Sequence, residues 1–176
     1  MPLDPQLAIM LLLKDHWNDT GAIPSTRGEI SYAERKSGAT TAGIQFLTSP
    51  VDETISSPQV TVVRPTPDDR LYMYASRLDR TITLSLGTPK HCLYTKTYLI
   101  KIRLKTLATG KQAKGQRKEE RWLVEEEIGR ILRTYPTSAI DVDDIKIDGG
   151  FNEDASVSPD VLASNVLIVA VYHRVT

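Results

Sequence analysis

The sequence contains few of the residues from which disulfide frameworks and metal centres are built. Its single cysteine, Cys92, excludes an internal disulfide and a CxxC zinc knuckle. The three histidines, His16, His91 and His173, are isolated from one another, and no known catalytic motif is present. We therefore predict no catalytic residues, no metal site and no cofactor.

The chain also lacks a charge surplus and a long hydrophobic run. Its 22 Lys and Arg balance 22 Asp and Glu, whereas a protein dedicated to nucleic acid usually has a basic surplus. The longest apolar run, residues 7–13, is far shorter than the roughly 20 residues that a membrane span needs. No basic residue precedes this run, so we predict neither a secretory signal nor a membrane partner.

A length of 176 residues suits one domain, spanning 1–176, with a substantial hydrophobic core. Hydrophobic periodicity predicts the α+β class, with an antiparallel β-sheet and two helices packed on one face. The predicted helices are 5–17 and 116–135. The predicted strands are 29–33, 59–63, 71–75, 81–87, 94–106, 144–147 and 165–175.

Several segments indicate which side chains face the core. In 94–106, alternation selects Tyr98, Ile100, Ile102 and Leu104. In 116–135, helical spacing selects Val124, Ile128, Ile131, Leu132 and Tyr135. Strand 165–175 is apolar on both faces, which predicts a central place in a sheet or a subunit contact. The first helix is apolar almost all round, which predicts a central position or cover by a partner.

One segment does not fit a compact domain. Residues 36–58 are rich in Ser, Thr, Gly, Ala and Pro, with one apolar island at 44–47. Structureless loops of this length are uncommon inside a domain. We predict a mobile arm or an inserted hairpin here.

The zero net charge is the sum of two opposed halves. Residues 90–121 contain ten Lys or Arg and two acids, whereas residues 125–160 contain ten acids and three bases. Three interpretations stay open: a strand face that contacts phosphate, head-to-tail pairing between copies, and charge balance inside one molecule. The interface candidates from these halves are Lys101, Arg103, Lys105, Asp144 and Asp148.

Trp122 is the most informative single residue. Helical geometry places it opposite the buried stripe, beside Glu125, Glu126, Gly129 and Arg133. Aromatic side chains anchor interfaces, so Trp122 and Arg133 are further interface candidates. The alternatives are that the long loop covers Trp122, or that it is merely a partly exposed tryptophan.

Four aspartates form a second cluster, at Asp141, Asp143, Asp144 and Asp148. Metal-dependent nucleases use several carboxylates to hold Mg²⁺. The spacing is not that of an EF-hand loop, and exposed carboxylates in a turn give the same pattern. We favour the solvated turn.

The order of these elements resembles a known family. A leading helix is followed by Ser57-Pro58-Gln59-Val60-Thr61-Val62, and the strand 98–102 then runs into the long helix 117–132. An acidic loop and the strand 166–172 close the chain. This pattern resembles the tail terminator, or tail-completion, proteins of tailed viruses of bacteria and archaea.

The resemblance implies a structural virion protein and not an enzyme. Such proteins form a homo-oligomeric ring, here expected to be a hexamer, at the head-proximal end of the tail tube. The ring ends tube polymerisation and joins the tail to the neck. Its partners are the tail-tube protein and a neck or connector protein, and viral DNA only passes through the lumen. The expected location is the tail or neck of the virion, after assembly in the host cytoplasm.

Two alternatives accompany this expectation. The first is another head–tail connector or neck adaptor, which sequence does not separate from a terminator. The second belongs to a different class, a small Mg-dependent nuclease or nucleic-acid-binding protein. It would use the four aspartates or the basic strand face.

Overall fold

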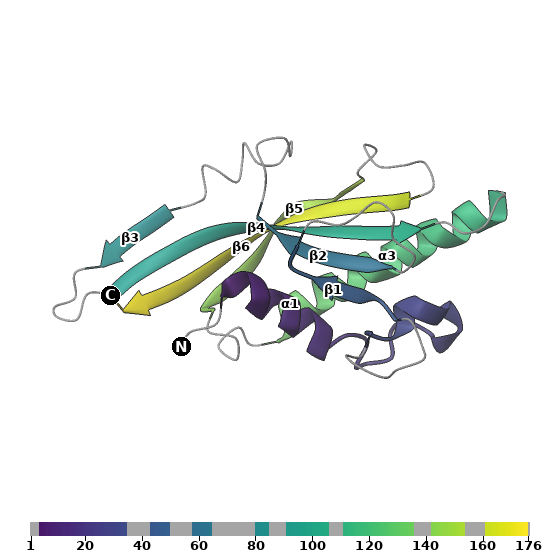
Figure 1. The fold of residues 1–176 in the computed structure, drawn as a ribbon, viewed down its shortest axis with the longest axis horizontal. Coiled ribbons are helices and arrows are strands. Elements are labelled where there is room, and N and C mark those ends of the chain that lie inside the picture. Colours follow the sequence, from purple (N-terminus) through teal and green to yellow (C-terminus); the bar gives the residue numbers. More distant parts are fainter. Residues whose placement is uncertain are drawn as a thin grey trace.

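The protein has a mixed α+β fold, in agreement with the predicted class. The computed structural model describes residues 4–34, 43–49, 58–64, 80–84, 91–105, 111–135, 142–153 and 161–175, and for 80–84, 91–93, 105, 111–114 and 173–175 the backbone alone. Its helical elements are α1 (Pro5–Asp15), the 3-10 helix η1 (Ser25–Ser31) and α3 (Lys111–Thr134) (Figure 1). The strands are β1 (Gln45–Leu47), β2 (Gln59–Val63), β3 (Arg80–Leu84), β4 (His91–Lys105), β5 (Asp144–Glu153) and β6 (Val161–Val175).

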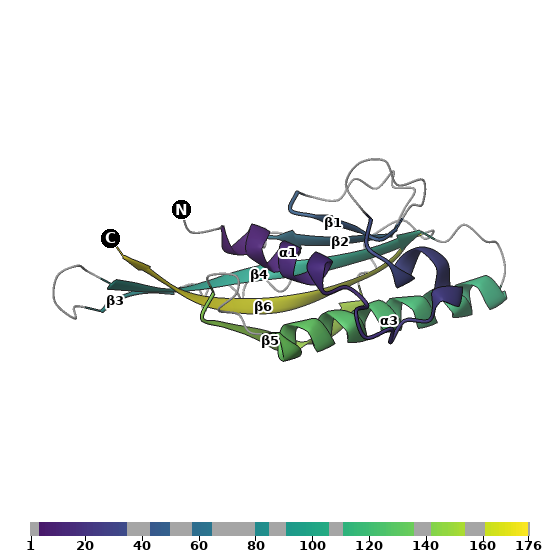
Figure 2. The same ribbon diagram turned by 90° about the horizontal axis from the view of Figure 1, so that it is seen from below.

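The six strands found in the described residues belong to one sheet (Figure 2). Their order is β1-β2-β4-β6-β5, and β3 pairs with the first part of β4. These pairs are antiparallel except that β1 runs parallel to β2, with Gln45 opposite Gln59. The predicted antiparallel sheet is therefore wrong at this edge. The segment 48–58 between β1 and β2 is longer than a hairpin turn, and a parallel pair needs such a connection.

β4 contributes to the core the side chains that the sequence pattern selects. Tyr98, Ile100, Ile102 and Leu104 are all buried, which confirms the predicted alternation. They belong to one cluster with residues from both α-helices and from β6, among them Ile9, Leu13, Ile128, Ile131, Val166 and Ile168. Removal of this apolar surface from water is the main favourable term in folding.

β6 lies at the centre of the sheet, as its two apolar faces predict. It pairs with β4 along its whole length, from Val161 opposite Lys105 to Val175 opposite His91. On its other side it pairs with β5. Val166, Ile168 and other alternate side chains enter the main core. Leu167 is buried in a second, smaller cluster with Leu99 and Val63.

The start of α1 is fixed by its cap and by one glutamine. The Asp4 carboxylate accepts the backbone N–H of Gln6 at 3.1 Å, and Pro5 stands at the first helical position. Gln6 Nε2 also donates to the carbonyl oxygens of Thr48 and Val62, each at 2.7 Å. These bonds tie the helix to the ends of β1 and β2.

The predicted strand 29–33 is wrong, because its first residues belong to η1. Gly28 has φ 62° and ψ −127°, a conformation that kinks the segment and that glycine tolerates best. The Trp17 indole N–H donates to the carbonyl of Ile30 at 2.8 Å, so a tertiary contact holds the turn. Ala33 retains a strand-like contact as an isolated parallel bridge to Ile44.

β5 is longer than the predicted strand 144–147. It continues through Gly149 and Gly150 to Glu153, beyond the predicted end of the strand, and β6 begins at Val161, before the predicted residue 165. A register shift between Asp148 and Asn152 accommodates the two glycines, and Gly149 has φ 80°. Glycines weaken a strand, but a bulge of this kind lets pairing resume beyond them.

The remaining boundaries agree with prediction to different extents. β2 matches 59–63, α1 ends two residues before 17, and α3 begins at Lys111 instead of 116. Within the predicted segment 36–58, residues 43–49 are described. They include β1 and the fully buried Ile44. Most of the rest of that segment, the predicted strand 71–75 and residues 85–87 lie outside the described residues.

We predict that Ile128→Ala lowers the free energy of unfolding by about 3 kcal/mol. Ile128 is fully buried at the centre of the main core, and its truncation leaves a cavity beneath β4 and β6. Urea unfolding followed by circular dichroism measures the change. Leu7→Ala, at an exposed position on α1, serves as the control and should cost less than about 1 kcal/mol. Equal losses for the two variants would contradict the placement of the core.

Candidate functional site

The inner side of α3 is joined to the end of α1 by a compact group of charges. Arg130 Nε and Nη2 donate to the two carboxylate oxygens of Glu127 at 2.9 and 2.6 Å. Arg130 Nη2 also donates to Asp19 at 2.8 Å and to the His16 carbonyl at 3.0 Å. The Asn18 backbone N–H donates to Glu127 at 2.7 Å. These contacts fix the turn after α1 against α3.

Burial of the Glu127 carboxylate explains why it needs a cation and hydrogen-bond donors close by. Glu127 is only 2 % exposed, and a buried carboxylate is costly unless it is paired and hydrogen-bonded. The hydrogen bond to Glu127 raises the pKa of Arg130 above its ordinary value. Partial burial opposes this effect, and the negative charges of Glu127 and Asp19 add to it. The guanidinium therefore stays charged, and the pair acts as a fixed structural link.

Two aromatic rings, those of His16 and Tyr135, pack beside the same charge group. The His16 and Tyr135 rings stack with their centroids 3.5 Å apart, and the Tyr135 hydroxyl donates to Asp19. The guanidinium carbon of Arg130 lies 5.8 Å from the centroid of the Tyr135 ring. His16 thus packs against an aromatic ring of α3.

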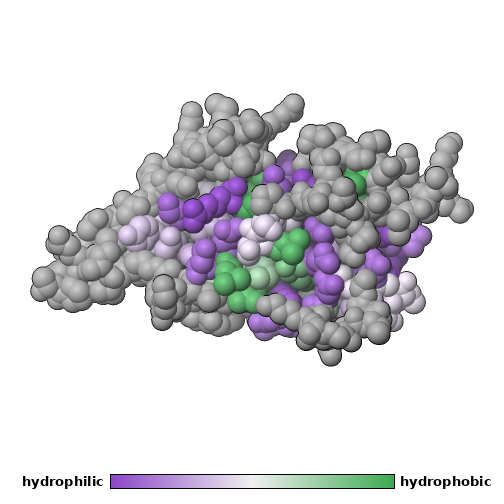
Figure 3. Space-filling model, in the orientation of Figure 1, coloured by the Kyte–Doolittle hydropathy of each residue, from purple (hydrophilic) through white to green (hydrophobic). Residues whose placement is uncertain are grey.

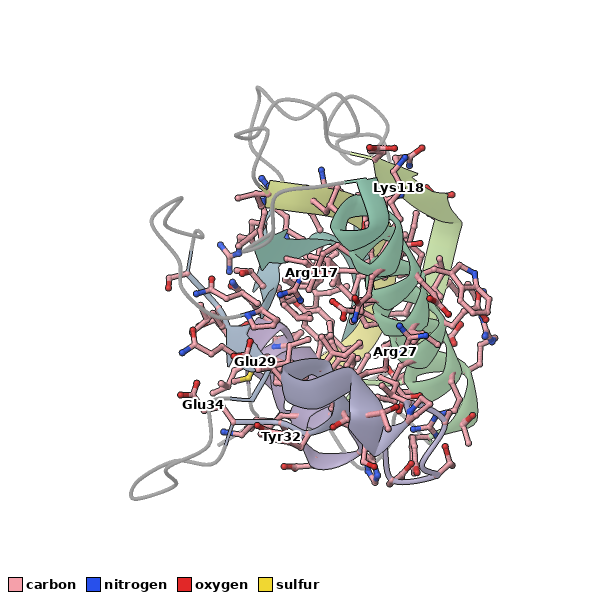
Figure 4. The ribbon with its side chains drawn as sticks, turned by 90° about the vertical axis from the view of Figure 1, so that its right-hand side faces the viewer. Arg27, Glu29, Tyr32, Glu34, Arg117 and Lys118 are labelled. Carbon is pink, nitrogen blue, oxygen red and sulfur yellow. The ribbon has the colours of Figure 1, made fainter. Side chains whose placement is uncertain are left out.

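Two further ion pairs hold the N-terminal half of α3. Arg27 of η1 donates to Glu119 at 2.7 Å, and Arg117 donates to the buried Glu120 at 2.6 Å. Figure 4 shows Arg27, Arg117 and Lys118 at this end of the molecule, with Lys118 at the outer side of α3. The first pair joins η1 to α3, and the second lies within α3 itself.

The opposite flank of α3 approaches β5 through one arginine. Arg121 Nε lies 3.5 Å from Glu125, and its Nη1 lies 3.5 Å from Glu153 on β5. Both arginine nitrogens are buried and have no hydrogen-bond partner among the described residues. The contacts of Arg121 are therefore longer-range charge interactions, and they hold α3 less strongly than the hydrogen-bonded ion pairs of Arg130 do.

The outer face of α3 carries the most exposed large hydrophobic side chain among the described residues, Trp122, which is 56 % exposed. Lys118 and Glu126 are exposed one turn before and one turn after it. Arg133 is exposed further along, and its guanidinium lies over Gly129. A Cβ atom at Gly129 would come within 2.9 Å of Arg133 Nη1. Trp122 thus stands on a helix that ion pairs fix on both flanks.

The other predicted interface residues lie on the sheet. Lys101 and Arg103 are half-buried on β4, and Arg103 donates to Asn165 at 3.3 Å. Asp144 on β5 is 3.2 Å from Lys146, and Asp148 is exposed. β6 runs between the two groups, so the structure places them on one sheet without making them neighbours. The side chain of Lys105 lies outside the described residues.

Several acids of the predicted acidic half are used inside the molecule. Glu125 and Glu153 approach Arg121, and Glu127 binds Arg130. This observation favours charge balance within one molecule as the account of much of the opposed charge. The spacing of Glu127 and Arg130 was visible in the sequence as an i,i+3 pair. Their link to Asp19 was not visible, because it joins segments far apart in the chain.

A hydrophobic area is visible over α1 and β1 (Figure 3). On α1, Leu7 is exposed and Leu11 is half-buried, and both lie away from the buried side chains of Ile9 and Leu13. On β1, Leu47 is half-buried. The predicted second apolar side of the first helix is therefore at the surface of the single chain.

The ranges that the structure describes contain no group of three His, Cys, Asp or Glu side chains placed to hold a metal ion. Asp143, Asp144 and Asp148 are within those ranges, and Asp141 is outside them. No helix in the described part of the chain is long and apolar enough to cross a membrane.

Comparison with known proteins leaves the residues above as the basis for a function. No protein-family model matches the chain, and no curated protein matches it.

We predict that Arg130→Met lowers the free energy of unfolding by about 2–3 kcal/mol, because it leaves the Glu127 carboxylate buried without its cation. Urea unfolding at neutral pH measures the loss. Arg133→Met is the matched control on the exposed face and should change stability by less than about 0.5 kcal/mol. The double variant Glu127→Gln, Arg130→Met should recover part of the loss. If Arg130→Met is as neutral as Arg133→Met, the charge group does not stabilise the fold.

Proposed function

We propose that this protein is a structural virion protein, a ring-forming tail terminator at the head-proximal end of the tail tube. One observation supports this proposal above the others. The sheet continues past α1 into a three-stranded end made of β3 and the adjoining parts of β4 and β6 (Figure 1). Strands that project from a domain are suited to contact neighbouring subunits.

The backbone pairing explains why this end is suited to assembly. The β5 ladder stops at Asp144 opposite Val171, whereas β6 continues to Val175. In the described residues, the last part of β6 and the outer side of β3 are therefore strand edges. Tyr94 and Tyr172 stiffen the base of this end, with stacked rings 5.3 Å apart. Unpaired strand edges are templates for pairing with another chain.

We further propose that α1 and α3 cover the same face of the sheet. Support comes from the main core, which unites α1, α3 and the even-numbered β4 side chains, and from Figure 2, in which both helices are nearer the viewer than the strands. On this arrangement the helices form the outer layer of a subunit. The other face carries Lys101 and Arg103, together with the buried residues Val63, Leu99 and Leu167.

In the proposed ring, subunits join head to tail. A heterologous contact that closes generates a ring, here of six copies, and complementary charge sets its register. Lys101 and Arg103 of one subunit would meet Asp144 and Asp148 of the next. The remaining surfaces would bind the tail-tube protein and a neck or connector protein. Viral DNA would only pass through the lumen, in a particle assembled in the host cytoplasm.

Another head–tail connector or neck adaptor is the second candidate of the same class, and the projecting strands support it equally. The candidate of a different class is a Mg-dependent nuclease or nucleic-acid binder. Two features weaken it. Asp144 is paired with Lys146, and the described aspartates are not grouped for a metal ion.

We predict that the purified protein, or the protein mixed with the tail-tube protein of the same virus, forms rings visible by negative-stain electron microscopy. Lys101→Glu should abolish the rings, because it places an acid opposite the acidic edge of the neighbour. Lys14→Glu, a reversal on α1, is the matched control and should leave rings intact. Light scattering gives the mass of each species.

Two results would argue against this function. The first is a strict monomer at high concentration that also fails to bind the tail-tube protein. The second is Mg²⁺-dependent cleavage of nucleic acid that is lost in Asp144→Asn or Asp148→Asn while the assembly state is unchanged. The second result would favour the nuclease.

A further inference from the structure

The outer face of α3 presents a symmetric arrangement of residues centred on Trp122. Lys118 stands four residues before it and Glu126 four residues after it, and all three side chains are exposed. Four residues correspond to about one turn and a rise of about 6 Å. The face therefore reads, along the helix, as a positive charge, an indole ring and a negative charge at equal spacing.

Neither of these two charges is used within the described part of the molecule. Neighbours of Lys118 at helical spacing are Arg121 and Trp122, so no acid is in reach on the same face. Glu126 has Gly129 three residues on, and Arg130, four residues on, is bound to Glu127 and Asp19. No ion pair to a described residue involves Lys118 or Glu126. Their contrast with the paired Glu119, Glu120 and Glu125 sets this face apart.

We propose that a second copy of this chain docks on this face, with the two α3 helices antiparallel and related by a two-fold axis at Trp122. The rotation stacks Trp122 on Trp122 of the other copy. It also brings each Lys118 opposite a Glu126, so that two ion pairs flank the indole contact. A parallel copy would instead oppose like charges. The charge order is therefore complementary to itself in the antiparallel arrangement alone.

The glycines of α3 follow the same symmetry. Gly115 and Gly129 stand seven residues before and after Trp122, so the rotation sets them opposite each other. The space where a Cβ would stand at Gly115 is open, whereas Gly129 is covered by the guanidinium of Arg133. The open position at Gly115 leaves room for the Arg133 side chain of the other copy. The Arg133 side chain of one helix would thus fill the open space beside Gly115 of the other helix.

The expected dimer is reversible. One helix face buries less than the roughly 1,200 Å² typical of stable interfaces, so we expect a dissociation constant of about 10–100 μM. The contact does not depend on the ring proposed above, because it uses neither the projecting strands nor Lys101. If one of the two proposals fails, the other still stands or falls by its own experiment.

Sedimentation velocity from about 1 μM to 1 mM tests the pairing, with the full chain carrying Lys101→Glu so that the rings proposed above do not form. This parent variant should change from monomer to dimer with concentration, and the addition of Trp122→Ala should keep it monomeric. Lys118→Glu and Glu126→Lys should each raise the dissociation constant at least about tenfold, since each places two pairs of like charges across the axis. The double variant Lys118→Glu, Glu126→Lys restores opposite charges and should dimerise again. Lys146→Glu, at a lysine 72 % exposed on β5, is the matched control.

Three outcomes would overturn the pairing. A monomer throughout the concentration range excludes it. So does a double variant no better than either single reversal, because the loss would then have another cause. Assembly that is insensitive to Trp122→Ala places the contact elsewhere on the chain. Far-ultraviolet circular dichroism of each variant checks that these exposed substitutions leave the fold unchanged.

Discussion

The burial of Glu127 constrains much of this structure. A carboxylate removed from water needs a cation and hydrogen-bond donors close by, and Arg130 and the Asn18 backbone supply them. Those donors come from α3 itself and from the turn after α1, so one group settles how both helices meet. The rotation of α3 about its axis follows from this contact. With Glu127, Ile128 and Ile131 turned inward, Trp122 has to face outward.

Much of the fold follows from local patterns. The alternation in β4 and the stripe of α3 each have one reasonable placement, because side-chain periodicity follows backbone geometry. The two apolar faces of β6 fit two placements, a central strand or a subunit contact, and the structure shows the first. The class of the fold and the exposure of Trp122 follow from the same periods. Residues in such regular elements are predictable from sequence alone.

The errors share a different cause. Residues 29–33 have strand propensity, but Gly28 and the Trp17 indole impose a 3-10 turn through contacts that no local window contains. Gly149 and Gly150 have the composition of a turn, yet β6 carries β5 past them with a bulge. The pairing of Asp19 with Arg130 likewise joins distant segments. The basic and acidic halves are visible in the sequence. Which of their charges form ion pairs inside the molecule depends on tertiary contacts.

The long ladder between β4 and β6 also sets the order in which the molecule can be built. Its pair closest in sequence is Lys105 with Val161, and its most distant pair is His91 with Val175. Closing the loop that contains α3 and β5 carries the first entropic cost, and each later pair adds little to it. We therefore expect the ladder to form from the end that holds the core toward β3. The end with β3 would then form last and open first, which would make it the least protected part of the sheet.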